Sequence, residues 1–141
     1  MQLRSHRLAN STMSDLVIID TCIWAPYFQK RNPPVRPIVD QLLREDRVLI
    51  IGPIVFELLA GIKRTDHARW LSSELRSLNW SDLEWSDYVL AADLSRSLAK
   101  AGHALPFVDL QIAAVTQRTK SMVFTSDPHF DLIPDLPRFT P

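Results

Sequence analysis

The 141-residue chain carries 16 basic and 16 acidic residues, so it has no net charge that would attract nucleic acid to its surface as a whole. Hydrophobic residues make up 46% of the sequence and charged residues 23%, which is typical of a globular domain. The one cysteine, Cys22, excludes an internal disulfide and fits a reducing compartment. The longest apolar run, from Val48 to Phe56, is too short to span a membrane. We therefore expect a cytoplasmic protein that contacts nucleic acid only through a local patch or through metal ions.

The first twelve residues include arginines but no apolar segment of the kind that a secretion signal requires. We expect residues 1–12 to form a flexible extension, with Met13 as an alternative start of the natural chain. Residues 13–141 contain no linker, repeat or low-complexity tract. We expect them to form a single domain.

Apolar runs and helical stripes alternate along the chain. In order, they predict a strand at 16–19, helices at 22–28 and 38–44, a strand at 48–51, helices at 53–61, 65–78, 86–102 and 105–119, and a strand at 121–125. Thr65 and Ser86 are the predicted N-caps of two of the helices. Strands separated by helices pair in parallel through right-handed crossovers. The predicted fold is therefore a three-layer α/β sandwich with a central, mostly parallel sheet.

Four carboxylates occupy unusual places in this pattern. Asp20 follows the first strand directly, and Asp127 comes two residues after the third. The carboxyl ends of strands are where ligands collect in open α/β sheets. Glu57 and Asp109 are isolated acids in the two most apolar helices, and we expect the Glu57 carboxylate to be half-buried. Burying an unpaired charge costs several kcal/mol unless another group compensates for it.

Each acid also has a purely structural interpretation. Asp20 and Asp127 are suited to capping turns, Glu57 could reach solvent from a boundary position, and Asp109 suits the positive end of a helix. These interpretations do not explain why several lone acids sit in apolar surroundings. A hard divalent cation, Mg²⁺ or Mn²⁺, would compensate their charge, because such ions prefer oxygen ligands. The sequence shows neither zinc-type histidine spacing nor a glycine-rich phosphate loop, so metal-assisted hydrolysis is the chemistry that it favours.

The residues around these acids resemble the four acidic motifs of the PIN domain. The matching segments, in order, are Ile18-Ile19-Asp20-Thr21, Val55-Phe56-Glu57-Leu58, Asp109-Leu110-Gln111-Ile112-Ala113-Ala114, and Thr125-Ser126-Asp127 followed by Phe130. The resemblance extends from Leu16 to about Phe139. The short single-domain form is similar to the VapC-type ribonuclease toxins of prokaryotic toxin–antitoxin pairs.

This resemblance implies a Mg²⁺- or Mn²⁺-dependent endoribonuclease that hydrolyses RNA phosphodiester bonds. It also implies a homodimer that is neutralised by a small antitoxin protein in its active-site groove. Carried over by motif, Asp20 and Asp109 would be the principal metal ligands and catalytic residues. Asp127 and Glu57 would complete the cluster, either directly or through water.

Neighbouring polar residues receive lesser roles. Thr21 and either Thr125 or Ser126 are expected to hydrogen-bond to the acids. His129 is expected to be a loop residue, with proton transfer as the less favoured role.

Two other functions remain open at this stage. One is a non-catalytic module that keeps the fold and binds RNA or a protein partner. The other is a metal-dependent DNA nuclease or phosphatase on a similar scaffold.

Overall fold

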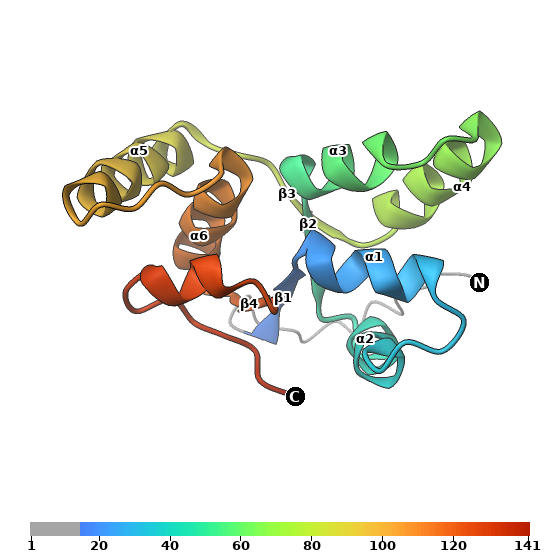
Figure 1. Ribbon diagram of the computed structural model, residues 1–141. Helices are drawn as coiled ribbons and strands as arrows, with labels where there is room; N and C mark the ends of the chain where they lie inside the picture. The colour runs from blue at the N-terminus through green and yellow to red at the C-terminus, as the bar shows by residue number, and fades with distance from the viewer. Residues whose placement is uncertain (1–14) are drawn as a thin grey trace.

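A computed structural model describes residues 15–141 of the chain (Figure 1). The expected extension over residues 1–12, and Met13 with it, lie outside the described residues. Within the described part, no helix is long and apolar enough to cross a membrane.

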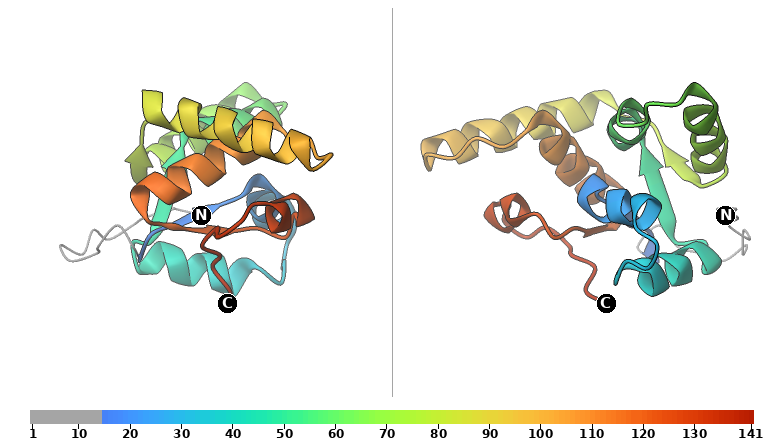
Figure 2. Two further views of the ribbon diagram at one scale, coloured as in Figure 1. Left: turned by 90° about the vertical axis from the view of Figure 1, so that its left-hand side faces the viewer. Right: turned by 45° about the vertical axis from the view of Figure 1, so that its right-hand side comes forward.

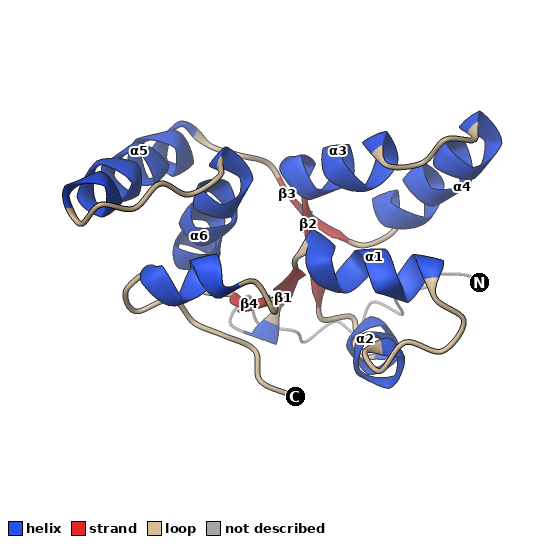
Figure 3. Ribbon diagram, in the orientation of Figure 1, coloured by secondary structure: helices blue, strands red, loops and turns tan. Residues whose placement is uncertain are grey.

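Four parallel strands form a small sheet at the centre of the molecule (Figure 3), in the order β3-β2-β1-β4. The strands are β1 (Val17–Ile19), β2 (Val48–Ile51), β3 (Asn79–Ser81) and β4 (Met122–Phe124). The helices are α1 (Thr21–Gln29), α2 (Arg36–Arg44), α3 (Gly52–Ala60), α4 (Thr65–Arg76), α5 (Trp85–Lys100) and α6 (Phe107–Thr119), followed by the short 3₁₀ helix η2 (Pro128–Leu132). All three strand pairings are parallel, as the sequence predicts.

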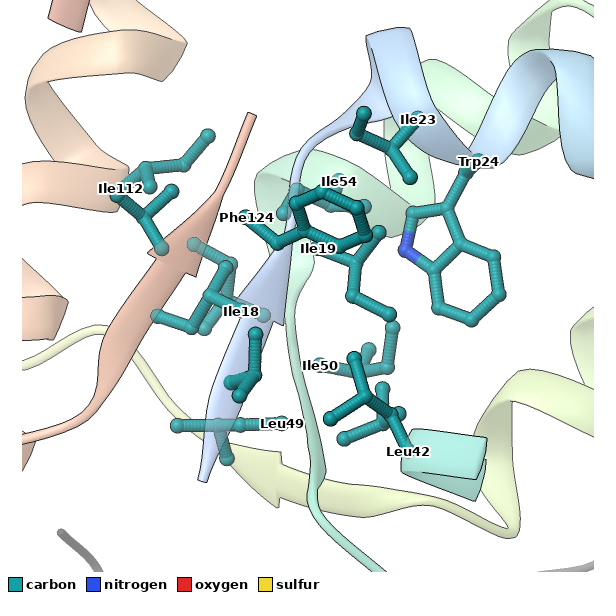
Figure 4. Close-up of a cluster of buried hydrophobic side chains, with 14 of the residues drawn as sticks. Ile18, Ile19, Ile23, Trp24, Leu42, Leu49, Ile50, Ile54, Ile112 and Phe124 are labelled. Carbon is teal, nitrogen blue, oxygen red and sulfur yellow. The ribbon is translucent and has the colours of Figure 1, made fainter. Parts of the chain in front are cut away.

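Helices cover both faces of the sheet (Figure 2), which confirms the three-layer prediction. Successive side chains along each strand point to opposite faces of the sheet, so the hydrophobic core is divided between these two faces. Ile18 points toward Ile112 of α6, while Ile50 points toward Leu42 of α2 (Figure 4). The side chains of Ile18, Ile50 and Ile112 are completely buried, because each central strand is covered on both sides.

Helices α5 and α6 form an arm that extends to one side of the sheet (Figure 1). A second, smaller apolar cluster joins them and consists of Ala91, Leu98, Leu110 and Ala114. A buried ion pair fixes the base of this arm: the Arg118 guanidinium donates to Asp87 at 2.9 Å, and the Asp87 side chain is 1% exposed. Asp87 also accepts the Glu84 backbone N–H at 2.8 Å. The arm is important for the site because the first turn of α6 carries Asp109.

The structure corrects three details of the sequence prediction. Strand β3 was not predicted, because its residues Asn-Trp-Ser are only partly buried at the edge of the sheet and do not form an apolar run. The Asn79 side chain fixes it there by donating to the Asp46 and Val48 carbonyls at 3.0 and 3.1 Å. The two predicted N-caps are also wrong. Helix α4 begins at Thr65 and its N-cap is Arg64, and the N-cap of α5 is Glu84 rather than Ser86. Glu84 and Asp87 cap α5 reciprocally.

We predict that Asp87→Ala lowers the free energy of unfolding by about 3 kcal/mol, because it removes the buried partner of Arg118 and leaves that guanidinium with only the more exposed Glu84 carboxylate at 3.4 Å. Urea denaturation measures this change as a lower midpoint. The control is Asp93→Ala, which breaks the exposed Asp93–Arg96 pair on the same helix and should cost less than about 1 kcal/mol. Equal losses in the two variants would contradict a structural role for the buried pair.

Candidate functional site

Adjacent strands bring two of the predicted acids to one edge of the sheet. Asp20 follows β1 and is the N-cap of α1, while Asp127 follows β4 and is the N-cap of η2. Because β1 and β4 are paired, with Ile19 opposite Phe124, the two segments leave the sheet side by side. The expectation that these acids meet at the carboxyl ends of the strands agrees with the fold.

The Asp20 carboxylate is 5% exposed and is oriented by three donors. Its Oδ1 accepts the Thr21 backbone N–H at 2.7 Å, and its Oδ2 accepts the Thr125 hydroxyl at 2.8 Å. The Cys22 thiol donates to the same Oδ2 at 3.3 Å. The Thr125 oxygen in turn accepts the Asp127 backbone N–H at 3.0 Å, so one hydroxyl links the two acidic segments.

Asp109 lies in the first turn of α6 and is 7% exposed. The pKa of its carboxyl is raised to about 6, chiefly by burial and to a smaller extent by the nearby charges of Asp20 and Asp127, against a hydrogen bond to His129 that lowers it. At neutral pH the carboxylate is therefore held in a charged form that its surroundings disfavour. A bound cation would relieve this cost.

Glu57 projects from α3, and the structure corrects its predicted environment. The residue is exposed rather than half-buried. Helix α3 is apolar on most sides, but only Ile54 and Leu58 are buried, and its outer side, including Phe56 at 71% exposed, faces solvent. The Glu57 carboxylate nevertheless turns toward the other acids, because its Oε1 accepts the Thr21 hydroxyl at 3.0 Å.

One pocket of about 290 Å³ joins all four predicted acids. Its lining residues are Asp20, Thr21, Cys22, Glu57, Pro106, Phe107, Val108, Asp109 and Asp127. This lining includes neither lysine nor arginine, so a phosphate group could enter only if a cation neutralised the acids. The donor set, which is rich in carboxylate oxygen, fits a hard divalent ion.

His129 is a member of this site that the sequence analysis assigned to a loop. Its Nδ1 lies 3.2 Å from Asp109 Oδ2 and 3.3 Å from Asp127 Oδ1. One ligand atom from each of these three residues lies within 4.8 Å of the other two. The sequence signal was the position of His129 two residues after Asp127, whose side chain caps η2 by accepting the His129 backbone N–H at 2.9 Å.

Comparisons with known proteins agree with this geometry. The family model of the PIN domain matches residues 17–136. VapC ribonuclease Mb1587 of Mycobacterium bovis is 31% identical over an alignment of 124 residues that covers 84% of this chain and 91% of that protein. Ribonuclease VapC11 of Mycobacterium tuberculosis matches with the same identity and coverage.

Solved structures show the same fold at lower identity. VapBC2 from Rickettsia felis, bound to a DNA fragment from its promoter, has a TM-score of 0.75 at 19% identity and covers 88% of this chain and 97% of its own. VapBC-1 from nontypeable Haemophilus influenzae has a TM-score of 0.73 at 21% identity and covers 88% and 96%. With the family model matching nearly the whole described chain and curated relatives above 30% identity, this chain belongs to the PIN domain family.

Proposed function

We propose that this protein is a metal-dependent endoribonuclease and acts as the toxin of a toxin–antitoxin pair. The observation that carries the proposal is the convergence of four carboxylates on one pocket, from the ends of β1 and β4 and from α3 and α6. The relatives named VapC ribonucleases support RNA as the substrate. We place the protein in the cytoplasm, where RNA is available to it.

In this proposal each acid has a distinct part. Asp20, oriented by Thr125, and Asp109 are the principal ligands of Mg²⁺ or Mn²⁺, and Asp127, whose oxygen lies close to that of Asp109, completes the cluster. When bound, the ion supplies an activated water and neutralises charge on the phosphate. Glu57, at the exposed side of the pocket, accepts the Thr21 hydroxyl and is placed to orient or deprotonate a water.

The partners follow from the relatives. The solved neighbours are VapBC assemblies, one of them bound to promoter DNA, and this supports a small antitoxin that covers the pocket of this chain. A homodimer of this chain remains part of the proposal. A non-catalytic binding module is less well supported, because it gives no reason to gather four acids around one pocket where the charge of Asp109 is disfavoured.

Asp109→Asn should reduce RNA cleavage by at least about a hundredfold, because it removes a charged metal ligand while preserving the shape of the side chain. The metal-free variant should also melt at a higher temperature than the metal-free wild type, since the substitution removes a buried charge near two others. Cleavage of a structured RNA and thermal unfolding measure the two effects. Asp66→Asn, in an exposed ion pair with Arg64, is the control and should leave both unchanged. Full activity of Asp109→Asn would refute the site assignment.

The Asp109 carboxyl should titrate near pH 6 in the metal-free protein, about two units above an ordinary aspartate. Because the folded state holds this proton more tightly than the unfolded chain does, the charged carboxylate destabilises the fold above pH 6. This cost disappears as the pH falls from about 6 to about 4. NMR of the carboxyl carbon gives the pKa, and denaturation at several pH values gives the linkage. The contribution should be absent from Asp109→Asn, and an ordinary pKa would argue against a clustered site.

The metal and substrate assignments can be tested together by offering matched RNA and DNA strands. We expect cleavage of RNA with Mg²⁺ or Mn²⁺, none with a chelator, and recovery when the metal is returned. Single-stranded loops should be preferred, because they expose bases and 2′-hydroxyls to the protein. Equal cutting of DNA would favour the general nuclease alternative, and loss of phosphate from small esters would favour a phosphatase.

A further inference from the structure

The side chain of His129 lies between two carboxylates of the pocket, although it belongs to none of the four acidic motifs. Its Nδ1 is nearly equidistant from Asp109 Oδ2 and Asp127 Oδ1, at 3.2 and 3.3 Å. The side chain is 46% exposed, so it could move away into solvent if nothing oriented it. Its position between the two acids therefore needs an explanation.

The turn that carries His129 is fixed on both sides of the residue. Asp127 caps η2 by accepting the His129 backbone N–H at 2.9 Å, so the acid and the imidazole belong to one hydrogen-bonded turn. Phe130, the next residue, is 1% exposed and anchors the turn in the main core. The backbone of His129 thus cannot shift without breaking a cap and withdrawing a buried ring.

We propose that His129 supplies a nitrogen ligand, through Nδ1, to the divalent cation held by Asp109 and Asp127. This inference rests on the proposed function. It adds a fifth residue to the proposed metal site and a preference of that site for one divalent ion over another. One ligand atom from each residue lies within 4.8 Å of the others, and ligands about 2.1 Å from a shared ion are at most about 4.2 Å apart. Small rotations of the side chains therefore suffice to coordinate one ion.

A nitrogen ligand changes which ion the site prefers. Mg²⁺ is a hard ion that favours oxygen, whereas imidazole suits the transition metals. A site of two carboxylates and one imidazole should accordingly bind Mn²⁺ more tightly than Mg²⁺ by a wider margin than a site of carboxylates alone. His129 would then determine metal selectivity, while the acids supply most of the charge.

Pulsed electron paramagnetic resonance of the Mn²⁺-loaded full-length protein tests the contact directly. We expect a nitrogen coupling to Mn²⁺ in the wild type that changes when histidines are labelled with ¹⁵N and disappears in His129→Ala. Titration of Mn²⁺ and Mg²⁺ should show that His129→Ala weakens Mn²⁺ binding by at least about tenfold and Mg²⁺ binding by much less. His103→Ala removes an exposed histidine before α6 and should leave both readouts unchanged.

Several results would overturn the inference. They are the absence of nitrogen coupling in the wild type, its survival in His129→Ala, and equal weakening of Mn²⁺ and Mg²⁺ binding by that variant. His129→Gln, which keeps a polar side chain of similar size, guards against a misfolded turn and should lose the coupling as well.

If metal binds without nitrogen coupling and RNA is cut, this inference fails and the proposed function stands. If the coupling is present but no RNA is cut, the proposed function fails instead. Failure to bind any metal would reject both.

Discussion

The pairing of β1 with β4 is the constraint on which the site depends. The Asp20 backbone N–H donates to the Phe124 carbonyl at 2.9 Å, which extends the pairing one residue beyond Ile19. This register brings the Thr125 hydroxyl to the Asp20 carboxylate. A shift of one residue would turn the side chains of one strand to the opposite face of the sheet and separate the two acids. The core that fixes the register therefore also fixes the geometry of the pocket.

The pocket combines this rigidity with an electrostatic cost. Asp109 is nearly buried beside two other acids, and its raised pKa records how strongly the surroundings disfavour its charge. The fold tolerates the arrangement because most of its free energy comes from the apolar core on both faces of the sheet. A bound cation would remove a repulsion that folding alone cannot remove.

Helix α6 connects the site to the rest of the molecule. Its first turn carries Asp109, its middle packs on the sheet through Ile112, and its last turn carries the arginine paired with Asp87. The α5–α6 arm is thus a support for one carboxylate of the pocket as well as a separate small core. A substitution in the last turn of α6 that shifts this helix would therefore also shift Asp109 in its first turn.

The sequence alone was sufficient to predict the parallel α/β fold and to single out the four acids that line one pocket. Continuous apolar runs such as Val48 to Ile51 are buried on both faces, and a lone acid such as Asp109 in an apolar helix is visible without coordinates. Hydropathy and spacing are local properties of the chain, so a single sequence is sufficient to read them.

Only the tertiary structure decided the rest. The polar edge strand β3 exists because Asn79 bonds to the neighbouring strand and the loop before it, and the exposure of Glu57 follows from which side of α3 the sheet covers. His129 lies beside Asp109, 20 residues away in the chain, because a capped turn and a helix meet there. These features depend on contacts between distant segments, and no local pattern encodes the distance between two side chains from different elements.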